Sequence, residues 1–222
     1  MIFKLPDRYK DRFDAARQLL EPLKEFLART DVILLAIPRG ALQIGNFLAR
    51  ELRLPLDVVI VKKLPAPASE ELAMGAVALD GGEVLDEEMV REFGVSDAYL
   101  VAERERLQKL MKEKDSAYHA AVPRIDLRSK VVVILDDGIA TGQTMRAAVE
   151  YARRQGAAKV VVVSPATSQE AFDMLKKIAD EVISLKTEQI FFAVGTYYVN
   201  FPQIEDDEAI QLLKEANKKE AA

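Results

Sequence analysis

Residues 131–144 read Val131-Val132-Val133-Ile134-Leu135-Asp136-Asp137-Gly138-Ile139-Ala140-Thr141-Gly142-Gln143-Thr144. The apolar, mostly β-branched run at the start of this stretch predicts a strand buried on both faces, as in a parallel sheet. Residues 145–151 continue as a predicted helix. The loop between strand and helix lies at the carboxyl end of the strand, where open α/β sheets bind their ligands. We therefore place a candidate binding site in this loop.

The loop combines an anion-binding element with a pair of carboxylates. Residues 141–144 begin the predicted helix, where unpaired backbone N–H groups and the helix dipole favour an anion such as phosphate. Gly138 and Gly142 let the backbone come close to a phosphate, and the two threonine hydroxyls add donors. Asp136 and Asp137 would repel a phosphate, but they suit ribose hydroxyls or Mg²⁺, held directly or through water. Together these groups predict a sugar-phosphate site.

This order of residue types resembles the motif with which type I phosphoribosyltransferases bind phosphoribosyl pyrophosphate (PRPP). In that family the acidic pair holds the ribose hydroxyls, and the Thr-Gly-x-Thr loop holds the 5′-phosphate. A plain polar turn before a capped helix would not need both the acid pair and the Thr141-Gly142-Gln143-Thr144 loop. A receiver domain that accepts phosphate would have acidic strand ends but would not need this cradle.

Composition narrows the class of protein further. The chain has 222 residues, of which 50% are hydrophobic and 30% charged, with a net charge of −5 and no cysteine. This length suits one α/β domain, and the acidic balance argues against a general nucleic-acid or membrane-surface binder. Disulfides, a zinc finger and a thiolate nucleophile are excluded. The chain has no apolar run near the roughly 20 residues of a membrane span and no signal-peptide pattern at its start, so we expect a cytoplasmic protein.

Further apolar runs extend the predicted sheet on both sides of residues 131–135. We expect an α/β fold, a Rossmann-like open parallel sheet of about five strands with helices on both faces. The other expected strands are Val32–Ile37, Asp57–Val61, Lys159–Pro165 and Glu181–Leu185. Expected helices cover residues 7–29, with Pro22 as a possible kink, then 42–52, 86–120, 168–179 and 206–219. The single histidine, His119, is expected to have a surface or capping role.

We expect one phosphoribosyltransferase-like domain over residues 1–222, with its core at about 31–185. The resemblance implies a small hood over the site, built from residues 1–30 and 186–222. It also implies a flexible loop at 64–85, read from the sequence as a loop followed by a hairpin. Residues 190–201 hold many of the aromatics; they could pack in the core, form a homodimer interface, or cover a planar acceptor in the hood.

A second polar stretch, Pro38-Arg39-Gly40-Ala41, follows the first predicted strand and opens the next helix. An arginine beside free backbone amides can bind pyrophosphate. The position matches the pyrophosphate loop of the family, which often contains a cis non-proline peptide. Lys62 and Lys63 are expected to close the next strand at the same edge, pointing to opposite faces, so that one of them reaches the pyrophosphate. We favour Lys62 slightly and keep Lys63.

The resemblance implies Mg²⁺-dependent transfer of the phosphoribosyl group from PRPP to a nitrogen nucleophile, a nucleobase-like small molecule, with release of pyrophosphate. The alternative is a regulatory protein that binds PRPP or another sugar phosphate without catalysis. Asp136, Asp137 and Arg39 are the catalytic candidates, and the two aspartates are also the candidates for holding Mg²⁺. The substrate-binding candidates are Pro38, Arg39, Gly40, Lys62, Lys63, Asp136, Asp137, Gly138, Ile139, Ala140, Thr141, Gly142, Gln143 and Thr144.

One position departs from part of the family. Hypoxanthine-guanine phosphoribosyltransferases carry an aspartate three residues after the second acid, and it serves the purine N7. Ala140 stands there in this chain, as in adenine phosphoribosyltransferases. Any base for the acceptor must therefore come from elsewhere, for example Glu70 or Glu71, and we expect no hypoxanthine-type activity.

Overall fold

The computed structural model describes residues 7–67 and 69–218. A five-stranded sheet forms its centre, in the order β2 (Leu56–Val58), β1 (Val32–Ala36), β6 (Val131–Leu135), β7 (Lys159–Ser168) and β8 (Glu181–Glu188). Every neighbouring pair is parallel, and β1 and β6 run in register from Val32 opposite Val131 to Ala36 opposite Leu135. The predicted α/β fold with a parallel sheet is confirmed.

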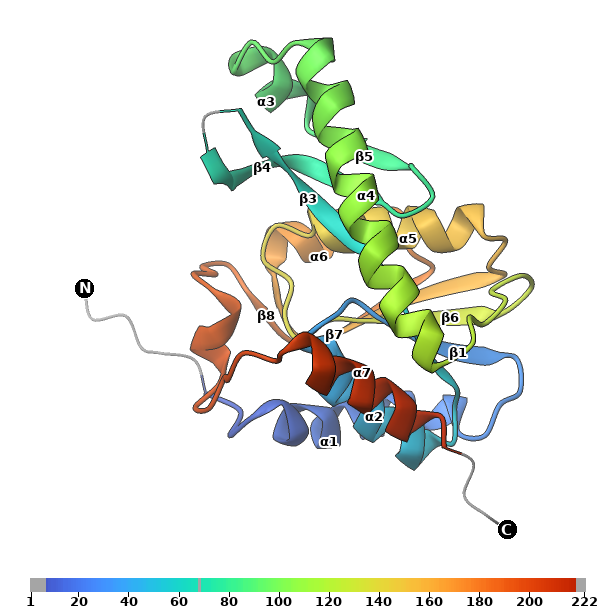
Figure 1. The fold of residues 1–222 in the computed structure, drawn as a ribbon. Coiled ribbons are helices and arrows are strands. Elements are labelled where there is room, and N and C mark those ends of the chain that lie inside the picture. Colours follow the sequence, from blue (N-terminus) through green and yellow to red (C-terminus); the bar gives the residue numbers. More distant parts are fainter. Residues whose placement is uncertain (1–6, 68, 219–222) are drawn as a thin grey trace.

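Alternate residues of the central strands point to two separate hydrophobic cores, because successive side chains of a strand face opposite sides of the sheet. Leu34, Val133 and Val161 share one core with α1 (Arg12–Leu23), α2 (Ala41–Leu52) and α7 (Asp206–Ala216). Ile33, Val132 and Val160 share the other with α5 (Gln143–Arg154) and α6 (Gln169–Leu175). Helices therefore cover both faces, as predicted (Figure 1).

The remaining helices lie near the two ends of the chain and in its charged middle. The helix expected at 7–29 is α1 followed by the 3-10 turn η1 (Lys24–Phe26), with Pro22 in the last turn of α1. The region expected to be helical at 86–120 divides into α3 (Glu87–Glu92) and α4 (Asp97–Ala121), and the Ser96 side chain caps α4. A second 3-10 turn, η2 (Val194–Tyr197), lies in the aromatic tail. No helix in the described part of the chain is long and apolar enough to cross a membrane.

The expectation for residues 57–85 was partly wrong. The parallel strand ends at Val58, and the chain then enters a separate antiparallel sheet of β3 (Val61–Ala66), β4 (Ser69–Ala78) and β5 (Glu83–Leu85). Lys62 and Lys63 therefore lie inside β3, opposite Val77 and Ala76, and do not close a strand of the central sheet. Most of the expected loop pairs its backbone in this sheet, while the hairpin at the Asp-Gly-Gly turn is confirmed as β4–β5. Figure 1 shows the small sheet and α3 standing away from the parallel sheet, with α4 running from one to the other.

His119 joins three parts of the fold. Its Nε2 lies 3.0 Å from Asp57 Oδ1 on β2, and its Nδ1 lies 2.9 Å from the Asp115 carbonyl oxygen one turn back in α4. Asp57 is buried and also accepts a hydrogen bond from the Ile125 N–H. The expected surface role was wrong, since the His119 side chain is only 13% exposed. Both ring nitrogens face acceptors at 3.0 Å or less, which favours the doubly protonated imidazolium, although the Arg124 guanidinium also lies 3.4 Å from Nδ1 and opposes it.

This contact predicts how stability depends on pH. The hydrogen bond to Asp57 is the main cause that raises the pKa of His119 above its ordinary value. The stabilisation is therefore complete below the unfolded-state pKa of about 6.5 and is lost as pH rises through the higher folded-state pKa. Urea unfolding between pH 6 and 9 should show wild-type stability falling relative to His119→Gln, which lacks the titrating group. Parallel pH curves for the two proteins would contradict this.

Candidate functional site

Two loops meet at the carboxyl edge of the sheet, because β1 and β6 are neighbours. The Ile37 N–H donates to the Leu135 carbonyl oxygen at 3.0 Å just before the two loops begin. Gly40 then lies against the acid pair: a Cβ added to Gly40 would stand 2.0 Å from Asp137 Oδ2. The Pro38–Arg39 peptide bond is cis. The structure thus brings the predicted pyrophosphate loop into direct contact with the predicted ribose-binding carboxylates.

The two helices that start at these loops begin differently from most others. Both α2 and α5 have a glycine at the N-cap, Gly40 and Gly142, with no side chain hydrogen-bonded to the first turn in the described structure. Neither helix has an acidic residue in its first turn. Side chains cap four other helices: Asp11 on α1, Asp86 on α3, Ser96 on α4 and Ser168 on α6. The first-turn N–H groups of α5 therefore remain available to an anion, whereas in α2 the Leu42 and Gln43 N–H groups already donate to the Arg39 and Gly40 carbonyl oxygens.

The loop of residues 138–144 packs against α6 and the residue that caps it on one side, and is exposed on the other. Gly142 has a φ of +75°, and a Cβ on it would stand 2.7 Å from Met174 Cε on α6. The Ser168 hydroxyl donates to the Ala140 carbonyl oxygen at 2.6 Å. The side chains of Ala140 and Thr141 are exposed. Glycine is therefore required at 142 by both backbone conformation and space, and the Thr141 face of the loop is accessible to a ligand.

The two adjacent carboxyl groups differ in environment. Asp136 Oδ1 accepts a hydrogen bond from the Asp137 N–H at 2.8 Å. Burial, and after it the charge of Asp137, raises the pKa of Asp136 well above its ordinary value. The Asp137 carboxylate instead pairs with a cation, the Arg12 guanidinium, at 2.8 Å. Asp137 is therefore the better candidate for the ionised group that faces a ligand.

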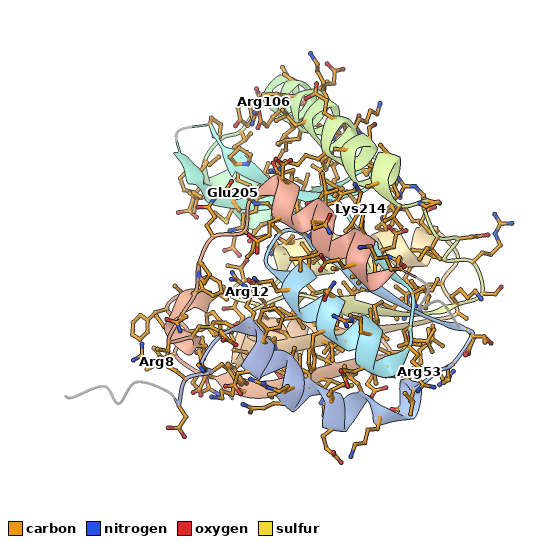
Figure 2. All side chains as sticks on the ribbon, turned by 60° about the horizontal axis from the view of Figure 1, so that its bottom comes forward. Arg8, Arg12, Arg53, Arg106, Glu205 and Lys214 are labelled. Carbon is orange, nitrogen blue, oxygen red and sulfur yellow. The ribbon has the colours of Figure 1, made fainter. Side chains whose placement is uncertain are left out.

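Arg12 was not among the site residues predicted from the sequence. Its Nε contacts Asp137, its Nη1 donates to the Pro202 carbonyl oxygen at 2.8 Å, and its Cζ lies 3.8 Å from the centre of the Phe201 ring. The side chain is only 4% exposed. Figure 2 labels Arg12 at the start of α1. One signal was available: Arg12 continues the buried stripe of α1, which is Ala15, Ala16, Leu19 and Leu23. An arginine on the apolar stripe of a helix needs a buried partner.

The aromatic tail packs on the acid loop. The Tyr198 hydroxyl donates to the Asp137 carbonyl oxygen at 2.6 Å, and a Cβ on Gly138 would stand 2.4 Å from Val194 Cγ1. Tyr197 and Tyr198 are buried, which agrees with core packing as one role of the tail. Phe192, at 71% exposed, extends from this region into solvent. The tail therefore supports the backbone of the site and also leaves apolar surface beside it.

Replacing Arg12 with leucine is expected to lower the free energy of unfolding by about 3 kcal/mol or more, because Asp137 would lose its cation in a largely buried pair. Urea unfolding would measure the change. Arg17→Leu is the matched control, since Arg17 is exposed on the same helix, and it should change stability by less than about 0.5 kcal/mol. Equal losses in the two variants, or none in Arg12→Leu, would show that the pair does not stabilise the fold.

The structure separates the two candidate lysines. Lys62 lines a small cavity of about 40 Å³ together with Pro38, Arg39, Lys114 and Tyr118, whereas Lys63 is exposed. Burial, followed by the charge of Lys114, lowers the pKa of Lys62. Lys62 is thus brought to Arg39 although it lies in a different sheet from the one expected, and Lys63 is not.

Two other features lie outside this constellation. A larger recess of about 1060 Å³ lies between the carboxyl-terminal ends of α2 and α7, lined among others by Arg50, Arg53 and Lys218. Because α2 runs antiparallel to the strands, its carboxyl-terminal end lies near the amino ends of the strands. The recess is therefore on the opposite side of the sheet from the loops that follow β1 and β6. Glu70 and Glu71, the suggested bases for an acceptor, have side chains outside the described part of the structure.

Comparison with known proteins agrees with this geometry. The sequence matches the family "Phosphoribosyl transferase domain" over residues 7–200. Two proteins of Mycobacterium tuberculosis (strains CDC 1551 and H37Rv), each named "Putative phosphoribosyl transferase", are 39% identical over 211 residues, covering 95% of this chain and 47% of theirs. The chain thus spans about half the length of these curated relatives.

A solved structure, that of the protein TT1426 from Thermus thermophilus, is 35% identical and has a TM-score of 0.79. The match covers 94% of this chain and 98% of that chain, so the similarity includes both sheets and the segments around them. The loops at the ends of β1 and β6 lie within the matched residues 7–200, as do Arg12 and Lys62. On the family match and the shared fold, this chain belongs to the phosphoribosyl transferase domain family.

Proposed function

We propose that this protein transfers the 5-phosphoribosyl group of PRPP to a nitrogen atom of a nucleobase-like acceptor. In this reaction the bond between the anomeric carbon and the pyrophosphate oxygen breaks, a carbon–nitrogen bond forms, and pyrophosphate leaves. The observation that carries the proposal is the contact of Asp137 with Gly40, between two helix starts that have no side-chain cap. One sugar with a phosphate at each end needs such an arrangement.

Each part of PRPP then has a candidate partner. The N–H groups and hydroxyls of residues 141–144 bind the 5′-phosphate, and Asp137, with Asp136 behind it, accepts hydrogen bonds from the ribose hydroxyls. Arg39 and Lys62 bind the pyrophosphate. Asp137 also lies near the positive charge that develops on the ribose as pyrophosphate departs, so its carboxylate stabilises the transition state. Arg12 holds that carboxylate in place without contacting the substrate.

The donor set at the acid pair fits Mg²⁺. No group of three or more acidic, histidine or cysteine side chains that could hold a metal occurs among the described residues. Two neighbouring carboxylates nevertheless suit Mg²⁺, which takes most of its ligands from water and substrate oxygens. Asp136 and Asp137 would hold it, and the bound ion would neutralise charge on the departing pyrophosphate.

The acceptor site is proposed to lie under the aromatic tail. Phe201 is 37% exposed, and its ring stacks at 4.9 Å on Tyr198, whose hydroxyl holds the acid loop. Tyr198 and the Arg12 guanidinium cover the two faces of the Phe201 ring, so a planar base would contact its exposed edge. Because Ala140 offers no carboxylate to a purine N7, hypoxanthine should not be turned over.

The proposal is tested in two steps. Isothermal titration with PRPP and MgCl₂ should show binding, and ribose 5-phosphate should bind more weakly because it lacks the pyrophosphate. Pyrophosphate release is then measured with PRPP across a panel of purine and pyrimidine bases, with hypoxanthine included. Release with at least one base other than hypoxanthine is the expected result.

The other outcomes distinguish the competing functions. Absence of PRPP binding would refute the proposal. Binding without release for any base would favour the regulatory alternative, a protein that binds PRPP without catalysis. Release that needs no acceptor would indicate hydrolysis.

A further inference from the structure

Tyr118 has an unsatisfied hydroxyl next to the predicted pyrophosphate loop. The side chain is 2% exposed, and its hydroxyl has no hydrogen-bond partner among the described residues. It lines the same small cavity as Arg39 and Lys62. A buried hydroxyl without a partner costs stability, so such a group in a cavity indicates a missing ligand or ordered water.

Lys114 lies one helical turn before Tyr118 on α4 and lines the same cavity. Three cationic side chains therefore converge there from different elements: Arg39 from the loop before α2, Lys62 from β3 and Lys114 from α4. Burial, followed by the like charge of Lys114, lowers the pKa of Lys62, and the Asp206 carboxylate partly offsets this effect. Like charges gathered in one place favour a polyanionic ligand.

Two carboxylates at the start of α7 partly neutralise this cluster. Arg39 Nη1 lies 3.5 Å from Glu205 Oε2 and 3.6 Å from Asp206 Oδ1, and Lys114 Nζ lies 3.1 Å from Asp206 Oδ1. The Glu205 and Asp206 side chains are 75% and 53% exposed. Figure 2 labels Glu205, which directly precedes α7. Ion pairs whose carboxylates are this exposed contribute little stability, and the two pairs of Arg39 are also long.

We propose that Lys114 and Tyr118 complete the pyrophosphate subsite with Arg39 and Lys62, and that Glu205 and Asp206 occupy its cations until the ligand displaces them. The inference rests on the proposed function and adds two residues of α4 to that site. A cavity of about 40 Å³ has room for a few water molecules but not for a diphosphate. Entry of the ligand therefore requires the two carboxylates to move away. Arg39 and Lys114 would then pair with the phosphate groups of the ligand in place of the Glu205 and Asp206 carboxylates.

A purely structural role for these pairs is the competing explanation. Lys114 and Asp206 do connect α4 to α7, and a tie of that kind would need no ligand. It would not account for the Tyr118 hydroxyl, which is buried without a hydrogen-bond partner among the described residues although its side chain lines the cavity. Nor would it account for the approach of Lys62 to two other cations.

The test is isothermal titration of the full chain with inorganic pyrophosphate and MgCl₂. Lys114→Met and Tyr118→Phe should each weaken binding by about tenfold, the loss of one hydrogen bond to a charged group. The double variant Glu205→Gln/Asp206→Asn should bind pyrophosphate more tightly than wild type. All variants should keep their affinity for ribose 5-phosphate, which does not use this subsite. Lys112→Met is the matched control, since Lys112 is exposed on the same helix, and it should bind as wild type does.

Failure of this inference can be told apart from failure of the proposed function. Wild-type affinity for pyrophosphate in both Lys114→Met and Tyr118→Phe would overturn the inference, even if PRPP binding depends on Arg39. Unchanged or weaker affinity for pyrophosphate in Glu205→Gln/Asp206→Asn would overturn the claim that pyrophosphate displaces these two carboxylates. If wild type binds neither PRPP nor pyrophosphate, both proposals fall. Because Lys114 is partly exposed and Tyr118→Phe keeps the buried ring, both variants are expected to fold.

Discussion

Replacement of Asp137 by asparagine is expected to lower PRPP-dependent pyrophosphate release by about 100-fold, the loss of about two charge-assisted hydrogen bonds to the ribose at about tenfold each. The amide keeps the shape of the side chain but carries no charge to offset the developing positive charge of the sugar. It also leaves Arg12 as a buried cation without its partner at 2.8 Å. Initial rates at saturating PRPP, together with urea unfolding of the same protein, separate the loss of activity from the loss of stability.

Asp136→Asn serves as the comparison for this variant. Since burial and the charge of Asp137 raise the pKa of Asp136, its carboxyl group is the one closer to the neutral state. An amide imitates a neutral acid, so Asp136→Asn should lose at least about tenfold less activity than Asp137→Asn, one lost charge-assisted bond being worth about tenfold. Equal losses, or the greater loss in Asp136→Asn, would contradict the assignment of the ionised group.

Replacement of Gly40 by alanine should lower the same activity by about 100-fold or more, because small displacements of catalytic groups cost that much. The added methyl group would stand 2.0 Å from Asp137 Oδ2 and 3.0 Å from Arg12 Nε. It cannot be accommodated unless the carboxylate or the loop shifts. Steady-state kinetics should show that the turnover number falls, and titration should show that PRPP binds more weakly.

Gly195→Ala provides the control for Gly40→Ala. Its added methyl group would meet the Phe201 ring at 3.3 Å, a side chain that can move by a few tenths of an ångström. This variant should keep most of the activity although it lies in the tail near the site. Normal activity in Gly40→Ala would mean that the two loops do not act together on one ligand.

Much of the fold could be predicted from local patterns along the chain. Runs rich in apolar residues predicted each strand of the central sheet, and the strand bounds differ from those observed by a few residues at most of their ends. The exception is the run at 57–61, which divides between two sheets after Val58. The residues on either side of the break are all apolar, so no change of composition marks it.

The candidate site likewise has a part that the sequence predicted and a part that it did not. Each of its two loops is one continuous stretch of sequence, so residue type and order were enough to predict Pro38–Gly40 and the stretch from Asp136 to Thr144. The roles of these residues stay predictions. The partners that shape those loops come from distant parts of the chain. Arg12 lies 125 residues from Asp137, and the Tyr198 hydroxyl lies 61 residues from the carbonyl oxygen that it holds.

The order of residues thus established a parallel α/β sheet and the chemistry offered at the ends of β1 and β6. Folding settled the rest: which cation pairs with Asp137, which lysine joins Arg39, and that His119 reaches Asp57. The physical reason is the range of the forces involved. Strand and helix patterns depend on neighbours within a few residues, whereas a buried ion pair or cavity depends on how whole elements pack, which no local pattern encodes.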